Sequence, residues 1–261
     1  MTAIRNPPGV ELPLTARSVI ASLLLGMHPP RMRGLQLVRW CALFGVAEGT
    51  ARVALHRMAA RGELVASDGS YELAGALAAR QRAQDWSLDP EPLDWSGEWR
   101  LGVVERGSRA ATRRQHLRDA MRRLRFAELR EGVWLRPDNL PASATTPGAR
   151  AIADEQARWF NARPDGDGAE LVALFAPDAW ASEARVLCTR LEHTADALAR
   201  EPEGAIADAF VLGAATLQHV RADPLLPAEL LATPWPGRAL RDVYHAYQDA
   251  FATAVADWFA R

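Results

Sequence analysis

The sequence predicts an α+β fold with an N-terminal winged helix-turn-helix, a central ferredoxin-like domain of βαββαβ order and a C-terminal helical domain. Three observations predict it: three short helical patterns before a hairpin signal, an alternation of strand and helix patterns in the middle, and helical periodicity in the last third. An acidic, proline-containing stretch predicts a linker. The expected boundaries are a winged-helix DNA-binding domain at 1–80, a linker at 81–94, a ferredoxin-like middle domain at 95–176 and a C-terminal helical domain at 177–261.

The first domain begins with three helical patterns. Thr15 is placed to be the N-cap of the first one, because its hydroxyl can accept a backbone N–H bond. The expected helices cover about 16–25, 35–44 and 48–60. Apolar residues at helical spacing predict the inward faces of the first two helices: Val19, Ile20, Leu23 and Leu24, then Leu35, Val38, Trp40 and Leu43.

A hairpin signal follows the third helix. Asp68-Gly69 separates two short runs that carry apolar residues, 63–66 and 71–73, which is the usual signature of a two-residue turn. The order helix, helix, glycine turn, helix, hairpin is that of a winged helix-turn-helix. In that motif the second helix of the pair enters the DNA major groove.

The third helix carries the candidate DNA-binding residues. Its inward face is expected to be Ala51, Ala54, Leu55 and Met58. The opposite face then holds the candidates, which are Gly49, Arg52, Val53, His56 and Arg57. Arginine can read guanine edges or hold phosphates, and histidine can donate to either. A plain three-helix packing unit with solvated arginines is the alternative, and the hairpin favours DNA binding over it.

The tip of the expected wing is unusual for a DNA-binding hairpin. Its sequence, Ser67-Asp68-Gly69-Ser70, contains no arginine. A wing normally adds cationic contacts to phosphate or to the minor groove, whereas Asp68 would repel phosphate.

The middle domain alternates strand and helix patterns. A strand is expected at 99–105, a basic helix at 109–125, strands at 126–129 and 133–135, a helix at 149–160 and a last strand at 170–175. This order, βαββαβ, is that of a ferredoxin-like domain. From 177 onward the pattern is helical, with helices expected at about 179–200, 205–220 and 238–260. The four prolines between the last two, in 221–237, exclude one continuous helix there.

Charge is segregated along the chain. The formal net charge is −1, and all 31 basic residues are arginine because the chain has no lysine. Arginine exceeds acid in residues 1–80 and 95–137, and acid exceeds arginine in 138–261. A uniformly basic nucleic-acid binder is excluded, but an anion-binding module joined to an acidic one is not. The hydrophobic fraction of 49% excludes disorder as the main state.

The basic helix is the second candidate site. Arg114, Arg118, Arg122 and Arg125 follow i, i+4 or i, i+3 spacing and predict one cationic stripe, above an apolar side made of Leu117, Met121 and Leu124. The stripe could hold DNA phosphates or the phosphate of an anionic ligand. The alternative is a solvated face that pairs with acids of the C-terminal half.

A polar cluster ends the second C-terminal helix. His219 and Arg221 are expected to cap that helix, with Asp223 pairing with Arg221. A metal site is poorly supported, because no second histidine lies at a ligand spacing. For a small-molecule effector, the candidate residues are Arg114, Arg118, His219 and Arg221.

Several classes of protein find no support in the sequence. Cys41 and Cys188 cannot form a disulfide framework or a four-cysteine zinc site, and they are expected to be small buried hydrophobes. No segment has the length of a membrane span, and residues 1–13 do not resemble a signal peptide, so a cytoplasmic protein is expected. The G-x-S-x-G, Walker and H-E-x-x-H motifs are missing, so no enzyme, catalytic residue or cofactor is predicted.

Three stretches taken in order resemble the phenylacetic-acid-degradation repressor family, or PaaX-like family. The first is Arg17–Gly26 with the helix-turn-helix segment Gly45–Gly62. The second is Trp95-Ser-Gly-Glu-Trp99, followed by the arginine-rich helix and Glu131–Pro137. The third and most specific is His219–Leu231, which closes with Trp235-Pro236-Gly237. The sequence departs from the family pattern at the wing, Ser67–Ser70, and after Leu231, where Ala232 stands in place of a proline.

The resemblance implies a dimeric bacterial repressor with a winged-helix domain, a ferredoxin-like middle domain and a helical C-terminal domain. It implies double-stranded operator DNA as one partner and an acyl-CoA effector such as phenylacetyl-CoA, which releases the repressor. The expected function is therefore a DNA-binding transcriptional repressor of a catabolic operon. Two alternatives stay open: a metal-dependent nuclease that uses the ferredoxin-like domain, and a protein-interaction module without DNA binding.

Overall fold

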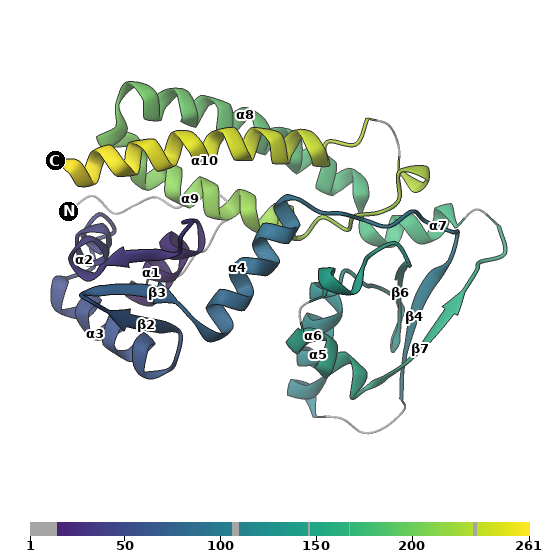
Figure 1. The fold of residues 1–261 in the computed structure, drawn as a ribbon. Coiled ribbons are helices and arrows are strands. Elements are labelled where there is room, and N and C mark those ends of the chain that lie inside the picture. The colour runs from purple at the N-terminus through teal and green to yellow at the C-terminus, as the bar shows by residue number, and fades with distance from the viewer. Residues whose placement is uncertain (1–14, 106–109, 146, 167, 232–233) are drawn as a thin grey trace. The chain divides into compact units, whose positions relative to one another are not determined.

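The computed structural model describes residues 15–105, 110–145, 147–166, 168–231 and 234–261. These residues form two compact units (Figure 1). The first unit contains the described residues of Met1–Asp85 together with Arg190–Leu217 and Val243–Arg261. The second contains the described residues of Trp86–Thr189 and Gln218–Asp242. Each unit combines segments from more than one of the expected domains. The expected domain boundaries stay a prediction.

The N-terminal part of the first unit is a winged helix-turn-helix. Its elements are α1 (Ala16–Leu25), β1 (Arg31–Arg33), α2 (Gly34–Ala42), α3 (Glu48–Ala60), β2 (Leu64–Ser67) and β3 (Ser70–Leu73). Thr15 caps α1 as expected, and its hydroxyl accepts from the backbone N–H of Ser18. The strands form an antiparallel sheet in the order β1-β3-β2. Asp68 and Gly69 have φ values of 51° and 71°, as the tight hairpin turn requires.

An aromatic cluster forms the core of the first unit. Trp40 of α2 is fully buried, and its ring lies 5.4 to 6.2 Å from the rings of Phe44, Phe210, Phe251, Trp258 and Phe259. Leu35 was expected in this core but is 70% exposed. The buried side of α2 consists of Leu37, Val38, Trp40 and Cys41, and Leu35 lies on the opposite side of the helix.

The second unit contains a ferredoxin-like domain. Its elements are β4 (Trp99–Val104), α5 (Ala111–Arg123), β5 (Ala127–Arg130), β6 (Val133–Pro137), η1 (Ala142–Ala144), α6 (Pro147–Asp154) and β7 (Ala157–Ala162). The four strands are antiparallel in the order β5-β6-β4-β7. The predicted order βαββαβ is confirmed, and the two helices lie over one face of the sheet (Figure 1).

Two expected elements of this domain are wrong. The helix expected over 149–160 ends at Asp154. The chain that follows forms the last strand, β7, in which successive side chains point to opposite faces of the sheet. The strand expected at 170–175 is instead the short helix α7 (Ala169–Val172) followed by η2 (Ala173–Phe175). A short apolar run does not distinguish strand from helix by periodicity, which explains the second error.

The expected linker is also partly helical. Helix α4 (Gly75–Leu88) includes the first half of 81–94, and it buries Gln81 and Gln84. Gln81 donates to the carbonyls of Leu25 and Met27 at 3.3 and 2.9 Å, so this polar helix is held to α1 by side-chain amides. Arg109, the expected start of the basic helix, and Ala232 lie outside the described residues.

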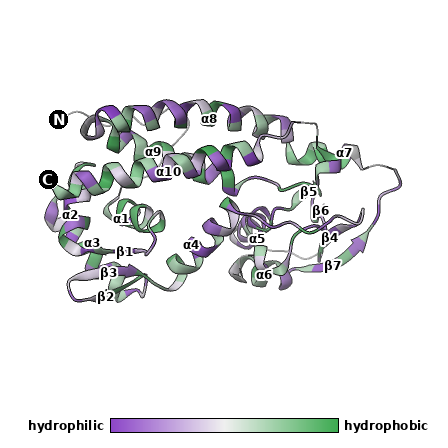
Figure 2. Ribbon diagram, turned by 45° about the horizontal axis from the view of Figure 1, so that its top comes forward, coloured by the Kyte–Doolittle hydropathy of each residue, from purple (hydrophilic) through white to green (hydrophobic). Residues whose placement is uncertain are grey.

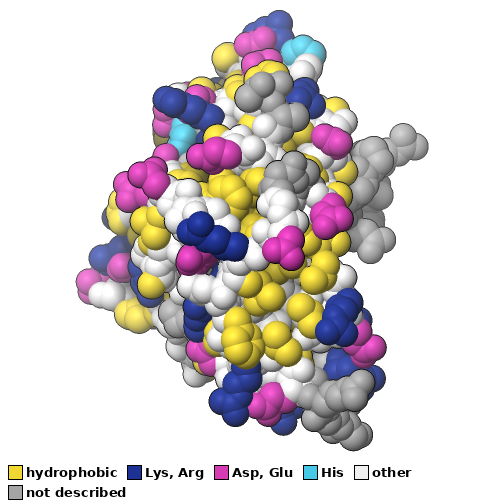
Figure 3. All heavy atoms as spheres, turned by 90° about the vertical axis from the view of Figure 1, so that its right-hand side faces the viewer, with side chains coloured by type: hydrophobic (Ala, Val, Ile, Leu, Met, Phe, Trp, Pro, Cys, Tyr) yellow, Lys and Arg dark blue, Asp and Glu magenta, His cyan; other side chains and the backbone are white. Residues whose placement is uncertain are grey.

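The two faces of the ferredoxin-like sheet differ. On the helix side, Leu117 and Met121 pack with Phe126 and Trp134 in a buried cluster. Gly102 lies on this face, where an added Cβ would come within 2.9 Å of the Trp159 ring. On the other face Leu101 lies beside Phe160, which is 52% exposed. Apolar side chains gather between charged ones on the side of the molecule that carries β4, β7 and α7 (Figure 3).

The C-terminal segment is helical, as expected. It consists of α8 (Pro177–Arg200), α9 (Pro202–Arg221), η3 (Ala228–Leu230) and α10 (Gly237–Ala260). Each long helix alternates apolar and polar residues along its length (Figure 2). Among the described residues, none of the helices is apolar over a length that would cross a membrane.

Candidate functional site

Helix α3 presents all five predicted DNA-binding residues to solvent. Ala51, Leu55 and Met58 are buried and Ala54 is half-buried, in agreement with the predicted inward face. The exposed residues on the other side are Gly49, Arg52, Val53, His56 and Arg57. Whether they contact DNA stays a prediction, but their exposure is what such a role requires.

Arg52 is held by an acid of its own helix. Its Nε and Nη2 atoms donate to one carboxylate oxygen of Glu48 at 2.9 and 2.7 Å. Both side chains are more than half exposed, so the pair contributes little to stability. DNA would have to compete with Glu48 for this guanidinium.

The wing sheet carries arginines that the sequence analysis missed. Strand β1 pairs with β3 so that Arg31 lies opposite Glu72 and Arg33 opposite Ser70, next to the wing turn. Gly34 donates to the Gly69 carbonyl at 2.9 Å, which fixes β1 against the turn. Arg31 and Arg33 are exposed and lie on the same side of the strand, because they are two residues apart. The only sequence signal for them was Arg-Met-Arg, a period-two pattern three residues long.

The cationic stripe on α5 is shorter than predicted. Leu117, Met121 and Leu124 are buried, and Arg114, Arg118 and Arg122 are exposed on the same helix, as expected. Arg118 lies 3.8 Å from Glu128 and Arg122 lies 3.8 Å from Asp119, so acids of the same domain partly neutralise the stripe. Arg125 is not part of it, because the helix ends at Arg123 and the chain turns at Arg125 with φ 60°.

Arg125 instead reaches a buried ionic cluster. Its Nε donates to the Asp223 carbonyl at 2.9 Å and its Nη2 to the Ser87 hydroxyl at 3.2 Å. Burial lowers the pKa of Arg125 to about 10. The carboxylate of Asp223, which is fully buried, accepts from Arg241 at 2.8 Å. This partner comes from the start of α10 and was not predicted, whereas the predicted pair of Asp223 with Arg221 stays a prediction.

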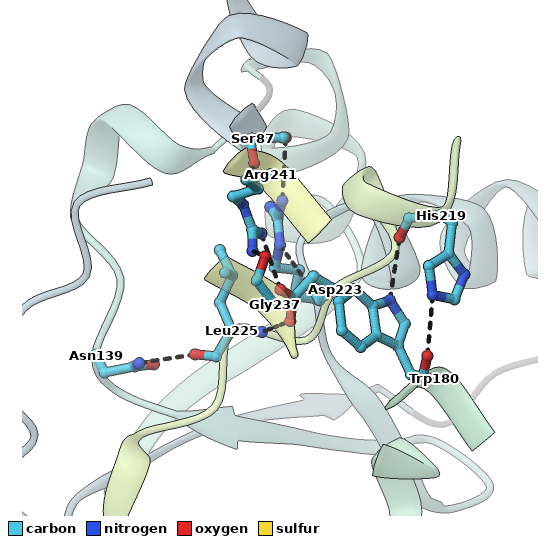
Figure 4. Close-up of polar contacts among 9 residues, drawn as sticks. Ser87, Asn139, Trp180, His219, Asp223, Leu225, Gly237 and Arg241 are labelled. Carbon is cyan, nitrogen blue, oxygen red and sulfur yellow. Dashed lines mark hydrogen bonds and ion pairs between the residues drawn. The ribbon is translucent and has the colours of Figure 1, made fainter. Parts of the chain in front are cut away.

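Further hydrogen bonds complete this cluster. Arg241 also donates to the carbonyls of Ser87 and Gly237, at 2.9 and 2.8 Å. The other oxygen of Asp223 accepts from the backbone N–H of Leu225 at 2.9 Å, and buried Asn139 donates to the Leu225 carbonyl at the same distance. Residues far apart in the sequence are thus fixed around one carboxylate (Figure 4).

His219 forms a reciprocal pair with Trp180 of α8. Its Nε2 lies 3.0 Å from the Trp180 carbonyl, and Trp180 Nε1 donates to the His219 carbonyl at 3.0 Å. The two rings stack at 4.6 Å, and Trp235 stacks on Trp180 at 4.8 Å. Burial lowers the pKa of His219, although the hydrogen bond to Trp180 acts in the opposite direction. His219 bonds a carbonyl as expected, but one from another helix.

A cavity of about 370 Å³ lies in the second unit. It is lined by Arg122, Arg125, Phe126, Ala127, Glu128, Trp134, Leu174, Phe175, Ala222 and Pro224. None of the four predicted effector residues lines it, but Arg221 directly precedes Ala222, and Arg118 lies one helical turn before Arg122. Among the described residues, no group of three or more His, Cys, Asp or Glu side chains is placed to hold a metal ion.

Comparison with known proteins finds one family over most of the chain. The description "PaaX-like protein" matches residues 15–77, "PaaX protein central Cas2-like domain" matches 92–172, and "PaaX-like protein C-terminal domain" matches 178–261. Among solved structures, the uncharacterized protein Rv0674 from Mycobacterium tuberculosis is similar, with a TM-score of 0.71 and 38% identity. That similarity covers 94% of this chain and 98% of the other. Comparison with curated protein sequences gives no match.

Proposed function

The chain belongs to the PaaX-like protein family, which implies a transcriptional regulator, and we propose that it represses a catabolic operon by binding double-stranded operator DNA. The observation that carries this proposal is the exposed face of α3, with Arg52, His56 and Arg57 on the helix that enters the major groove in a winged helix-turn-helix. Arginine and histidine side chains supply the donors that base edges and phosphates accept.

The arginines of β1 support the proposal by supplying charge that the wing tip lacks. Arg31 and Arg33 are exposed beside the wing turn, where phosphate contacts are made in many winged helices. Asp68 repels phosphate at the tip, but Arg33 lies opposite Ser70 and offsets that repulsion. The wing sheet as a whole is therefore suited to a phosphate backbone.

The repressor acts as a homodimer in this proposal. Two copies place two α3 helices in successive major grooves, roughly 34 Å apart, so the operator is expected to be an inverted repeat. An acyl-CoA effector such as phenylacetyl-CoA binds one state of the dimer more tightly and so releases the DNA.

A gel-shift titration with the promoter of the chain's own operon tests DNA binding. Arg52→Ala is expected to weaken specific binding by about 5- to 150-fold, because a lost bidentate base contact corresponds to roughly 1–3 kcal/mol. Arg238→Ala is the matched control, since Arg238 is exposed on α10 and lies 3.9 Å from Asp242. The proposal fails if the wild-type chain does not retard the promoter, or if both variants weaken binding equally.

A further inference from the structure

The cavity of the second unit lies against an excess of buried positive charge. Arg125 lines it and also belongs to the ionic cluster with Arg241, in which Asp223 is the one fully buried carboxylate among the described residues. Arg241 donates a hydrogen bond to that carboxylate. Arg125 instead donates to a backbone carbonyl and to a hydroxyl, both of which are neutral. Asp223 also attracts Arg125, so two guanidinium groups share one buried carboxylate, and a further anion in the cavity would be stabilised.

Apart from Glu128, whose carboxylate lies 3.8 Å from Arg118, the remaining lining residues are suited to an apolar group. Phe126, Trp134 and Phe175 provide aromatic surface, and Leu174 and Pro224 provide aliphatic surface, next to the guanidinium groups of Arg122 and Arg125. A volume of about 370 Å³ is at the small end of the range of ligand sites. The chemistry is that of a small organic anion, charged at one end and apolar at the other.

Backbone strain gathers at the same place. Four described non-glycine residues have a positive φ, and one of them, Asp68, belongs to the wing turn. The other three are Arg125, with φ 60°, Ala176, with φ 47°, and Leu225, with φ 52°. Arg125 lines the cavity, and Ala176 and Leu225 directly follow the lining residues Phe175 and Pro224. Such conformations are unfavourable for residues with a Cβ and are concentrated at ligand sites.

We propose that this cavity is the effector site and that it takes an organic acid or phosphate ester, with the anion at Arg122 and Arg125 and the apolar part against Phe126, Trp134 and Phe175. The assignment rests on the proposed function, because it supplies the effector of that regulator. It differs from the predicted set Arg114, Arg118, His219 and Arg221, none of which lines the cavity. Ala222 and Pro224 belong to the segment between α9 and α10, so an occupant contacts the chain just after the end of α9.

Isothermal titration calorimetry on the full chain tests the site with three probes: phenylacetate, phenylacetyl-CoA and free CoA. Arg122→Gln removes one guanidinium of the cavity, and Arg123→Gln is its matched control, because Arg123 is exposed on the same helical turn and does not line the cavity. Ala222→Phe fills the cavity from an exposed position, so that folding is preserved. Circular dichroism of each variant verifies the fold before the titration.

The expected result is that at least one probe binds, that Arg122→Gln weakens it about tenfold or more, and that Arg123→Gln leaves it unchanged. Ala222→Phe is expected to abolish binding. Phenylacetate alone identifies a free acid as the source of the anion, and binding of phenylacetyl-CoA without phenylacetate identifies the CoA phosphates. The assignment is overturned if no probe binds, or if Arg122→Gln and Arg123→Gln behave alike. Operator retardation is measured in parallel, so failure of the cavity and failure of DNA binding are distinguished.

Discussion

Asp223 contacts several segments of the second unit. Its side chain is fully buried, bonds Arg241 and the Leu225 backbone, and lies next to the guanidinium of Arg125. We expect Asp223→Asn to lower the free energy of unfolding by about 3–5 kcal/mol, because removing the carboxylate leaves the Arg241 charge buried without a counterion. Urea denaturation measures the loss. The control is Asp242→Asn, whose exposed pair with Arg238 is worth about 0–1 kcal/mol; equal losses in the two variants would contradict the prediction.

His219 predicts a pH dependence of stability. Burial lowers its pKa in the folded chain below the ordinary value of 6.5, so the unfolded chain takes up the proton first as the pH falls. The contribution of the neutral ring is therefore fully present above pH 6.5 and is lost below it. We expect the melting temperature of the wild type to fall more steeply between pH 7 and pH 5 than that of the His219→Gln variant. The glutamine keeps a hydrogen-bond donor toward the Trp180 carbonyl but does not titrate. Parallel melting curves would contradict this reading.

At the scale of single residues, the sequence predicted which side chains are exposed better than it predicted which side chains contact one another. The five candidates on α3 are exposed, because an amphipathic helix determines which side chains face inward. The pair of Asp223 with Arg241 was missed, because Arg241 lies 18 residues away on α10 and no local spacing indicates that contact. Arg125 was assigned to a stripe by its i, i+3 spacing, but helix α5 ends two residues before it.

At the scale of elements, strand β1 changes the interpretation of the wing. The hairpin β2–β3 was predicted from its Asp-Gly turn, but a three-residue strand that pairs across 40 residues gives too little pattern to be predicted. The same limit applied to β7, where a helix was expected, and to α7 and η2, where a strand was expected. The long helices α8, α9 and α10 were predicted because periodicity over 20 residues or more leaves little ambiguity.

The arginines of β1 give a prediction that separates the wing from the recognition helix. Arg33→Gln is expected to weaken binding to operator and to unrelated DNA by the same factor, because phosphate contacts carry no sequence information. Arg52→Ala is expected to weaken operator binding more than binding to unrelated DNA. Fluorescence anisotropy with the two DNAs measures both ratios. A larger effect of Arg33→Gln on the operator alone would show that β1 reads bases.

At the scale of the whole molecule, the net charge of −1 does not describe the surface that would meet DNA. Arginine exceeds acid in residues 1–80, and four exposed arginines lie on two neighbouring elements of the winged helix: Arg31, Arg33, Arg52 and Arg57. Many of the acids of 138–261 lie on the long helices α8, α9 and α10, in the C-terminal part of the sequence. Repulsion between the acidic surface and DNA falls off within about 8 Å at physiological salt, so the arginines can act locally.

This local action predicts a strong dependence of operator affinity on salt. Two copies of the chain bring eight such arginines to one operator. The logarithm of the association constant is expected to fall linearly with the logarithm of the salt concentration. The slope is expected to be about −7 if all eight arginines contact phosphates, and about −3.6 if half of them contact bases instead. Anisotropy titrations between about 50 and 200 mM NaCl give the slope. Arg33→Gln in both copies is expected to reduce it by about 2, whereas Arg238→Gln, far along the chain on α10, leaves it unchanged. A wild-type slope shallower than about −1 would mean that the arginines of α3 and β1 do not meet DNA, and association through apolar surface would then explain the binding.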